Sequence, residues 1–139
     1  MEWFSFEGVN WLAVALAFLA SFVLGWFWYA PQGFFKPWAE AAGLAPGALQ
    51  GAKMGPAFVQ TFVANVLGVI VLAVLMANLG VASWWEGLLF GGLLGLVFRG
   101  GAHALHNGFA LRSGRVTFID AAHDASALAI AGAILGLIA

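Results

Sequence analysis

The sequence predicts an all-α integral membrane protein: a four-helix bundle with a short interfacial segment between its first and second helices. Of its 139 residues, 63% are hydrophobic and only 8% are charged, whereas soluble domains are about 25% charged. Residues 8–35 and 54–85 carry no charged side chain. A bilayer core of about 30 Å is crossed by about 20 apolar helical residues, so each stretch can hold one span. We expect a single transmembrane domain over residues 1–139.

The first two spans have recognisable start and stop signals. The first is predicted at residues 11–29, where Asn10 can cap the helix. The second is predicted at residues 56–77, because Pro56 suits a first helical turn and Gly80 is a common helix stop.

The last two spans are predicted at residues 84–105 and 118–138. The spacing of Ser83 with Glu86, and of Thr117 with Asp120, is typical of a capping box. The uncharged runs after Glu86 are too short to span a bilayer alone. Both helices are therefore expected to carry ionisable residues into the membrane at one end.

Loop charges predict the orientation. The loops after the first and third spans hold four basic residues, and the other loop and the C-terminus hold none; the four are Lys36, Lys53, Arg112 and Arg115. Because basic loops stay in the cytoplasm, we expect a multi-pass protein of the inner membrane with both termini outside. Residues 31–55, which contain three of the four prolines, are predicted to form a turn and a short helix among the lipid headgroups.

Small residues at four-residue spacing predict close helix packing. In lipid, such residues let helix backbones approach each other. They lie in the third and fourth spans: Gly87, Gly91, Gly95, Gly132 and Gly136. The pattern leaves open whether these glycines pack within the bundle or against another subunit.

Most ionisable residues of the spans are expected at one depth, near the inner ends of the third and fourth helices. This predicted polar network comprises Arg99, His103, His106, Asn107, Asp120, His123 and Asp124. It could be an ion-pair and hydrogen-bond network that holds the helices together, or a path for protons or ions. A third possibility is a metal or tetrapyrrole ligated by His103, His106 or His123 with Asp120 or Asp124. No spacing among them is diagnostic of a metal site.

Several function classes are disfavoured. The chain has no cysteine, which excludes thiolate chemistry, and its net charge of −1 argues against a nucleic acid partner. No nucleophile elbow or phosphate-binding loop is present. We therefore expect no enzymatic activity and no catalytic residue, and a cofactor only if the histidines bind one.

The inner end of the first span carries a distinctive aromatic motif, residues 25–31 (GWFWYAP), followed by Phe34, Phe35 and Trp38. Together with residues 119–122 (IDAA) and 132–136 (GAILG), this motif resembles the domain of unknown function 1761 family. That family implies four spans in a small bacterial membrane protein and no assigned function. In physical terms, Pro31 ends the helix, and Trp28, Tyr29 and Trp38 anchor that end at the interface.

The function expected from these observations is that of a non-enzymatic inner-membrane protein. Its partners would be the lipid bilayer and either further copies of itself in a homo-oligomer or the other subunits of a larger membrane complex. The alternatives are a small oligomeric transporter or channel with a His/Asp path, and metal or tetrapyrrole binding.

Overall fold

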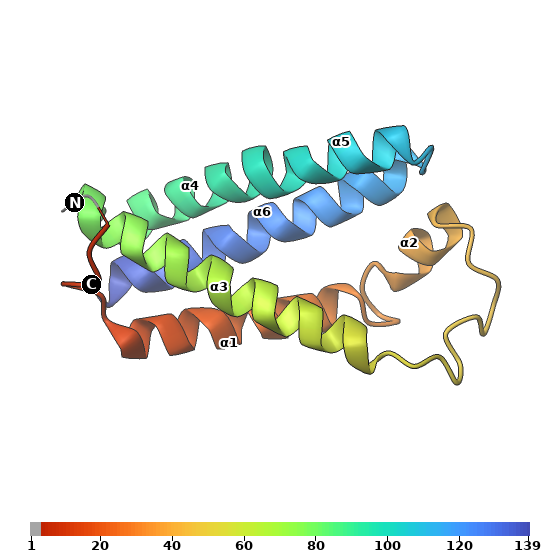
Figure 1. Ribbon diagram of the computed structural model, residues 1–139, viewed down its shortest axis with the longest axis horizontal. Helices are drawn as coiled ribbons and strands as arrows, with labels where there is room; N and C mark the ends of the chain where they lie inside the picture. Colours follow the sequence, from red (N-terminus) through yellow and green to blue (C-terminus); the bar gives the residue numbers. More distant parts are fainter. Residues whose placement is uncertain (1–3) are drawn as a thin grey trace.

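The computed structural model describes residues 4–139, and every regular element in that range is helical. Figure 1 shows the arrangement of these elements, which are α1 (Trp11–Trp28), α2 (Phe35–Ala41), α3 (Gly55–Leu79), α4 (Trp84–Leu94), a π-helical segment η1 (Gly95–Gly100), α5 (Gly101–Phe109) and α6 (Gly114–Leu137). Four helices are long and apolar enough to cross a membrane: α1, α3, the continuous α4–η1–α5 and α6. The predicted all-α membrane bundle is confirmed.

Helix-capping residues act largely where the sequence places them. The Asn10 side chain accepts hydrogen bonds from the backbone N–H groups of Leu12 and Ala13, at 3.1 and 3.2 Å. Pro56 lies in the first turn of α3, and Gly80 ends that helix in the left-handed conformation with φ of 70°. These signals depend only on local backbone geometry, which is why they can be read from the sequence.

The predicted capping box of Thr117 and Asp120 is wrong. Helix α6 begins at Gly114, and its N-cap is Ser113, whose hydroxyl accepts from Arg115 N–H at 3.2 Å. The third span likewise continues to Phe109 rather than to residue 105. Charged and polar residues end the apolar span but do not end a helix, so both helices extend beyond the stretch that hydropathy marks out.

Helix α6 occupies the centre of the bundle and contacts α1, α3 and the whole α4–η1–α5 helix. Its closest neighbour is α4, where glycines lie against the α6 backbone. A Cβ atom added at Gly87 would overlap the carbonyl oxygen of Gly132, and one added at Gly91 would overlap that of Leu128. The structure thus places these glycines inside one chain, between α4 and α6.

The two ends of the bundle are fixed by polar contacts between α1 and α6. At one end, called the Asn10 end, the Asn10 amide donates to the Ile138 carbonyl at 2.9 Å. At the other, called the Tyr29 end, Tyr29 donates to Asp120 at 2.7 Å. Helix α1 has 18 residues, about 27 Å at 1.5 Å per residue, which matches a bilayer core. Because Tyr29 pairs with Asp120 and α6 begins at Gly114, the first residues of α6 extend beyond the Tyr29 level.

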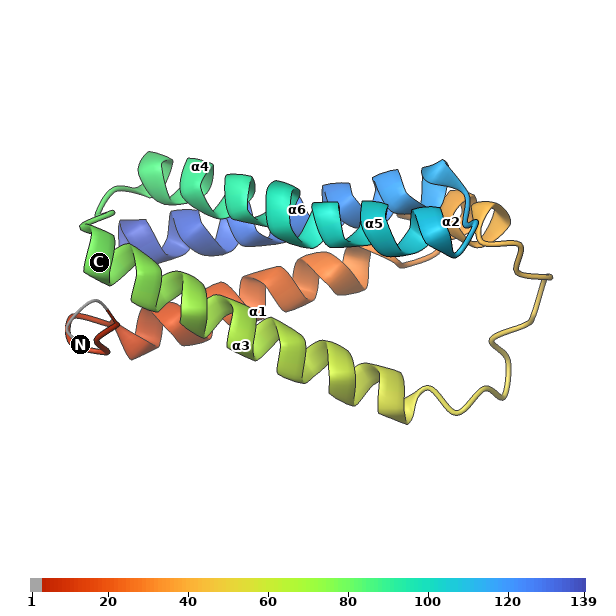
Figure 2. The ribbon, with the colours of Figure 1, turned by 45° about the horizontal axis from the view of Figure 1, so that its top comes forward.

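Packing is unequal along α3. Its half near the Asn10 end supplies buried core residues, including Val69, Leu72 and Ala73, which pack with Ala17 and Ala131. In contrast, every residue from 55 to 64 is exposed. Figure 2 shows why: α3 diverges from the other spans toward the Tyr29 end. In this half the Phe62 ring contacts Phe18 and Phe22 of α1, with centroids 5.1 and 6.2 Å apart, but no residue from 55 to 64 is buried.

Candidate functional site

The carboxylate of Asp124 is the centre of a polar cluster that joins α6 to the third span. Its Oδ2 lies 3.1 Å from His103 Nε2, and its Oδ1 lies 3.0 Å from His123 Nδ1 and 4.0 Å from Arg99 Nη1. The Asp124 side chain is 17% exposed. We call these four residues the Asp124 cluster. Asp124 is one helical turn closer to the Asn10 end than Asp120, so the cluster lies about one turn inside the Tyr29 level.

Close backbone packing brings Arg99 to this carboxylate. Arg99 lies in the π-helical segment η1, and the glycines at both ends of that segment, Gly95 and Gly100, are buried. A Cβ atom on Gly95 would lie 2.6 Å from the Asp124 carbonyl oxygen. Because π turns are rare and concentrate at functional sites, the position of Arg99 within one marks this part of the third span as unusual.

Arg99 also reaches across to α3. Its Nη2 donates to the Ala64 carbonyl at 3.3 Å. Gly68 makes room for this contact, because a Cβ atom at that position would overlap the guanidinium group. The Arg99 side chain is 27% exposed, so the guanidinium group bridges α6 and α3 at the place where α3 begins to diverge.

His123 faces the opposite side of α6, toward the end of α1. Its ring centroid lies 5.8 Å from that of Trp28 and 5.2 Å from that of Tyr29. The absence of a side chain at Gly25 accommodates the ring, because a Cβ atom there would be 3.1 Å from His123 Nε2. Since Nδ1 donates to Asp124, Nε2 of the neutral ring is a free acceptor.

Three buried nitrogen atoms near this ring have no hydrogen-bond partner within residues 4–139. They are Nε2 of His123 and the indole nitrogens of Trp28 and Trp38. All three belong to one aromatic group, because Tyr29 contacts both the His123 and the Trp38 rings. Unpaired buried polar atoms, here two donors and one acceptor, are energetically costly, and these three are gathered in this part of the described structure.

The aromatic anchor takes part in tertiary structure as well as marking the helix end. Trp28 ends α1, and Tyr29 caps it. After Pro31 the chain turns back, and Phe34 N–H donates to the Trp28 carbonyl at 2.7 Å. Asp120, predicted to cap α6, instead accepts from the Tyr29 hydroxyl. The sequence gives no signal for this bond, because the two residues are 91 positions apart.

Tyr29→Phe is expected to destabilise the protein by about 1.5 to 3 kcal/mol, since it removes a hydrogen bond to a charged acceptor. The change can be measured by thermal unfolding in detergent. Asp120→Asn in the Tyr29→Phe background should then cost little more, because the bond is already lost. Equal and additive losses for the two substitutions would contradict a direct Tyr29–Asp120 interaction.

Not all of the predicted polar network lies in the Asp124 cluster. Asn107 donates to Thr117 Oγ1 at 3.1 Å, in a separate contact near the start of α6. His106 is exposed, and its side chain makes no hydrogen bond to any residue in the described range. The extension of α5 explains this placement, because it carries both residues past the Tyr29 level.

The chemistry open to the Asp124 cluster is limited. Within residues 4–139, no three His, Asp or Glu side chains are arranged to hold a metal ion. A proton could pass between His103 and His123 through Asp124. Toward the Asn10 end, however, the helices meet through Ala13, Ala17, Val69 and Ala131, which are buried and apolar. A relay inside one chain would therefore stop at this core.

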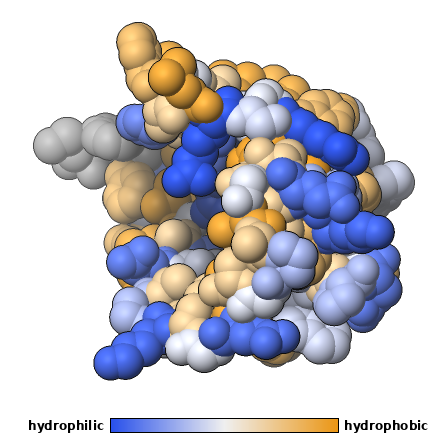
Figure 3. Space-filling model, turned by 90° about the vertical axis from the view of Figure 1, so that its right-hand side faces the viewer, coloured by the Kyte–Doolittle hydropathy of each residue, from blue (hydrophilic) through white to orange (hydrophobic). Residues whose placement is uncertain are grey.

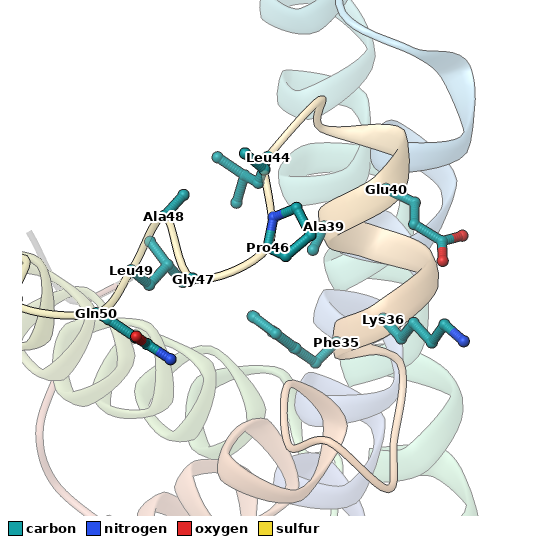
Figure 4. A pocket seen from close by; sticks show the side chains of 11 residues that line it. Phe35, Lys36, Ala39, Glu40, Leu44, Pro46, Gly47, Ala48, Leu49 and Gln50 are labelled. Carbon is teal, nitrogen blue, oxygen red and sulfur yellow. The ribbon is translucent and has the colours of Figure 1, made fainter.

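The surface at the Tyr29 end combines polar side chains with apolar ones, as Figure 3 shows. A cavity of about 500 Å³ lies here between α2 and residues 44–50. In Figure 4 the side chains of Phe35 and Leu49 border it, whereas Lys36 and Glu40 point away from it on the far side of α2. The cavity thus offers apolar contact but little charge, and it is separate from the Asp124 cluster.

Comparison with known proteins gives one match. A family model described as a protein of unknown function (DUF1761) matches residues 12–136. No curated protein and no solved structure matches the chain. The match covers all four spans, the aromatic motif and the Asp124 cluster, and it carries no assigned activity.

Proposed function

We propose that this chain, which belongs to the DUF1761 family of proteins of unknown function, is a non-enzymatic inner-membrane protein that works as a homo-oligomer. In this proposal the Asp124 cluster is a structural clamp rather than a reaction centre. The carboxylates of the spans support this role, because each one is engaged by a neighbour. Asp124 contacts two histidines, Asp120 accepts from Tyr29, and Glu86 accepts from the Ser83 hydroxyl at 2.6 Å.

The observation that carries the oligomer proposal is the exposed half of α3. Three of its apolar side chains stand out at the Tyr29 end: Phe58 is 63% exposed, Val59 64% and Val63 47%. Transmembrane helices gain stability by packing along their length, and here the chain supplies the contacts of Phe62 with Phe18 and Phe22 but buries no residue from 55 to 64. A second copy that covers this side of α3 would supply them. A larger complex with other proteins would use the same surface.

The absence of cysteine makes the test direct. In native membranes, Val59→Cys is expected to form disulfide-linked dimers under mild oxidation, because equivalent positions on two copies of α3 would lie close together. The matched control is Leu93→Cys, which is 60% exposed on α4 and should stay monomeric. The products can be separated on a non-reducing gel, and the mass of the purified particle measured in detergent.

A monomeric mass together with no cross-linking at Val59 would overturn the homo-oligomer. Cross-linking of equal yield at Val59 and Leu93 would have the same consequence, because it would reflect random collision in the membrane. Cross-links from Val59 to a different protein, with none between copies, would show an accessory subunit instead.

The orientation is proposed from the charges of the loops. Four basic residues lie at the Tyr29 end: Lys36 in α2, Lys53 and Arg112 in the connections, and Arg115 in the first turn of α6. That end should therefore face the cytoplasm. A cysteine at Asn78, in the last turn of α3 at the opposite end, is expected to react with a membrane-impermeant reagent added from outside. A cysteine at Gly114 should not react. The reverse labelling pattern would show the opposite orientation.

A further inference from the structure

The guanidinium group of Arg99 is only partly satisfied by the protein. It has five N–H donors, and residues 4–139 offer it two contacts: one to the Ala64 carbonyl at 3.3 Å and one to Asp124 at 4.0 Å. The second distance is too long for a hydrogen bond. With 27% of its side chain exposed, Arg99 keeps N–H donors that no residue in the described range accepts.

His103 offers a further nitrogen beside Arg99. Its Nε2 is used by Asp124, while its Nδ1 bonds to no residue in the described part of the chain. The side chain is 36% exposed. Both residues contact the same carboxylate, so the His103 ring lies beside the guanidinium group. With Nε2 donating to Asp124, Nδ1 donates to an anion in the doubly protonated ring.

The part of α3 that lies beside Arg99 has small side chains. On α3, positions 61, 64 and 68 follow one side of the helix at spacings of three and four, and they are Thr61, Ala64 and Gly68. Gly68 already accommodates the guanidinium group. Leu67 and Val71 share the side of Ala64 and are 57% and 45% exposed. A ligand beside Arg99 would therefore meet little steric bulk near the charge and apolar side chains deeper in the membrane.

Charge at the Tyr29 end favours an anion. All five Lys and Arg side chains of the protein lie at or just inside this end, together with all three histidines, against three carboxylates. The carboxylates are those of Glu40, Asp120 and Asp124. Arg99 is one helical turn inside the Tyr29 level, a depth from which a long side chain can reach the headgroup phosphates.

We propose that Arg99, together with the doubly protonated ring of His103, binds the phosphate of an anionic phospholipid, with an acyl chain of that lipid lying along Leu67 and Val71 on α3. Guanidinium groups pair with phosphate through charge-assisted hydrogen bonds. Basic sites between transmembrane helices on the cytoplasmic side are typical positions for anionic lipids. Thr61, Ala64 and Gly68 lie on a different side of α3 from Val59, and the site is argued from the contacts of Arg99 rather than from the proposed dimer.

The test compares lipid binding to the purified full-length chain by native mass spectrometry. Phosphatidylglycerol and phosphatidylcholine are titrated separately, and the bound lipids per chain are counted. The wild-type chain is expected to bind one phosphatidylglycerol about tenfold more tightly than phosphatidylcholine. In Arg99→Gln/Asp124→Asn this preference should disappear, since a charge-assisted hydrogen bond contributes about a tenfold change in affinity or more.

The matched control is Arg112→Gln/Glu40→Gln, which also removes one positive and one negative charge at the Tyr29 end. It should keep the preference. A preference that survives in the Arg99 variant, or that is lost equally in the control, would overturn the site. Thr61→Trp provides a variant with the charges intact, and it should weaken phosphatidylglycerol binding by obstructing the approach along α3. Unchanged binding in Thr61→Trp would count against the proposed position.

Competition with inorganic phosphate distinguishes a site for a lipid headgroup from a site for free phosphate. At millimolar concentration it should leave the bound phosphatidylglycerol in place, because only the lipid gains contacts with Leu67 and Val71. If inorganic phosphate displaces the lipid and binds with equal strength, the site recognises free phosphate, and the lipid proposal fails.

Discussion

Gly91→Ala is expected to destabilise the protein by about 3 kcal/mol, and Gly91→Leu should prevent the native fold. The reason is that α4 and α6 meet backbone to backbone at this point. A Cβ atom on Gly91 would overlap the Leu128 carbonyl oxygen, and a backbone group cannot move aside as a side chain can. Overpacking in a tight core commonly costs 1–3 kcal/mol, and the rigid obstacle places this site at the upper limit. Thermal unfolding in detergent measures the loss.

Gly101→Ala is the matched control, in the same transmembrane helix. No atom lies within 4 Å of the Cβ position at Gly101. Because alanine favours a helix over glycine by about 1 kcal/mol, this variant should be as stable as the wild-type protein or slightly more stable. Equal destabilisation of the two variants would show that helix propensity, rather than the α4–α6 contact, decides the outcome. A changed oligomer mass with an intact Gly91→Leu fold would instead place these glycines at a subunit interface.

The sequence predicted those parts of the fold that depend on local chemistry. The four spans follow from hydropathy, and the caps at Asn10 and Gly80 follow from backbone geometry that a single residue type satisfies. The sequence did not predict the end of the third span at Phe109 or the start of α6 at Gly114, because the lipid boundary and the helix boundary are different physical limits. It also left open which surface the glycines pack against, since a small residue permits close approach without specifying the partner.

In the candidate site, too, the sequence predicts some features and leaves others undetermined. Helical spacing placed His103, His123 and Asp124 at a common depth, and depth depends only on the rise per residue. Which groups touch depends on the rotation of each helix about its axis. The π-helical segment around Arg99 alters that rotation, and no pattern in the sequence announces it. The Tyr29–Asp120 bond and the Ala64 contact of Arg99 join distant parts of the chain, so they could be seen only in the folded molecule.

Asp124→Ala is expected to destabilise the protein by about 3 kcal/mol, the lower end of the cost of removing one partner from a buried charged contact, because the Asp124 side chain is 17% exposed. The loss should exceed that of Arg99→Ala, because Asp124 holds two histidines at hydrogen-bond distance, whereas Arg99 stands 4.0 Å away. Asp124→Asn should lie between the two, since the amide can keep one hydrogen bond but loses the charge. Thermal unfolding in detergent measures all three changes.

A double-mutant cycle then distinguishes the two possible partners of Arg99. With Asp124 removed, the Arg99 charge is left unpaired in the membrane, where an isolated charge costs about 2.5 to 3.5 kcal/mol on the insertion scale. In Asp124→Ala, the Arg99 side chain lowers most of this cost by extending toward the headgroups. Adding Arg99→Ala should therefore make the double variant about 1 kcal/mol more stable than Asp124→Ala. Asp120→Ala should show no coupling to Arg99, because its carboxylate is bound to Tyr29.

Strictly additive losses for Arg99 and Asp124, or stronger coupling of Arg99 to Asp120, would refute the clamp. If the wild-type protein carries a proton flux in liposomes, and single variants abolish that flux while their melting temperature is unchanged, the cluster serves transport rather than stability.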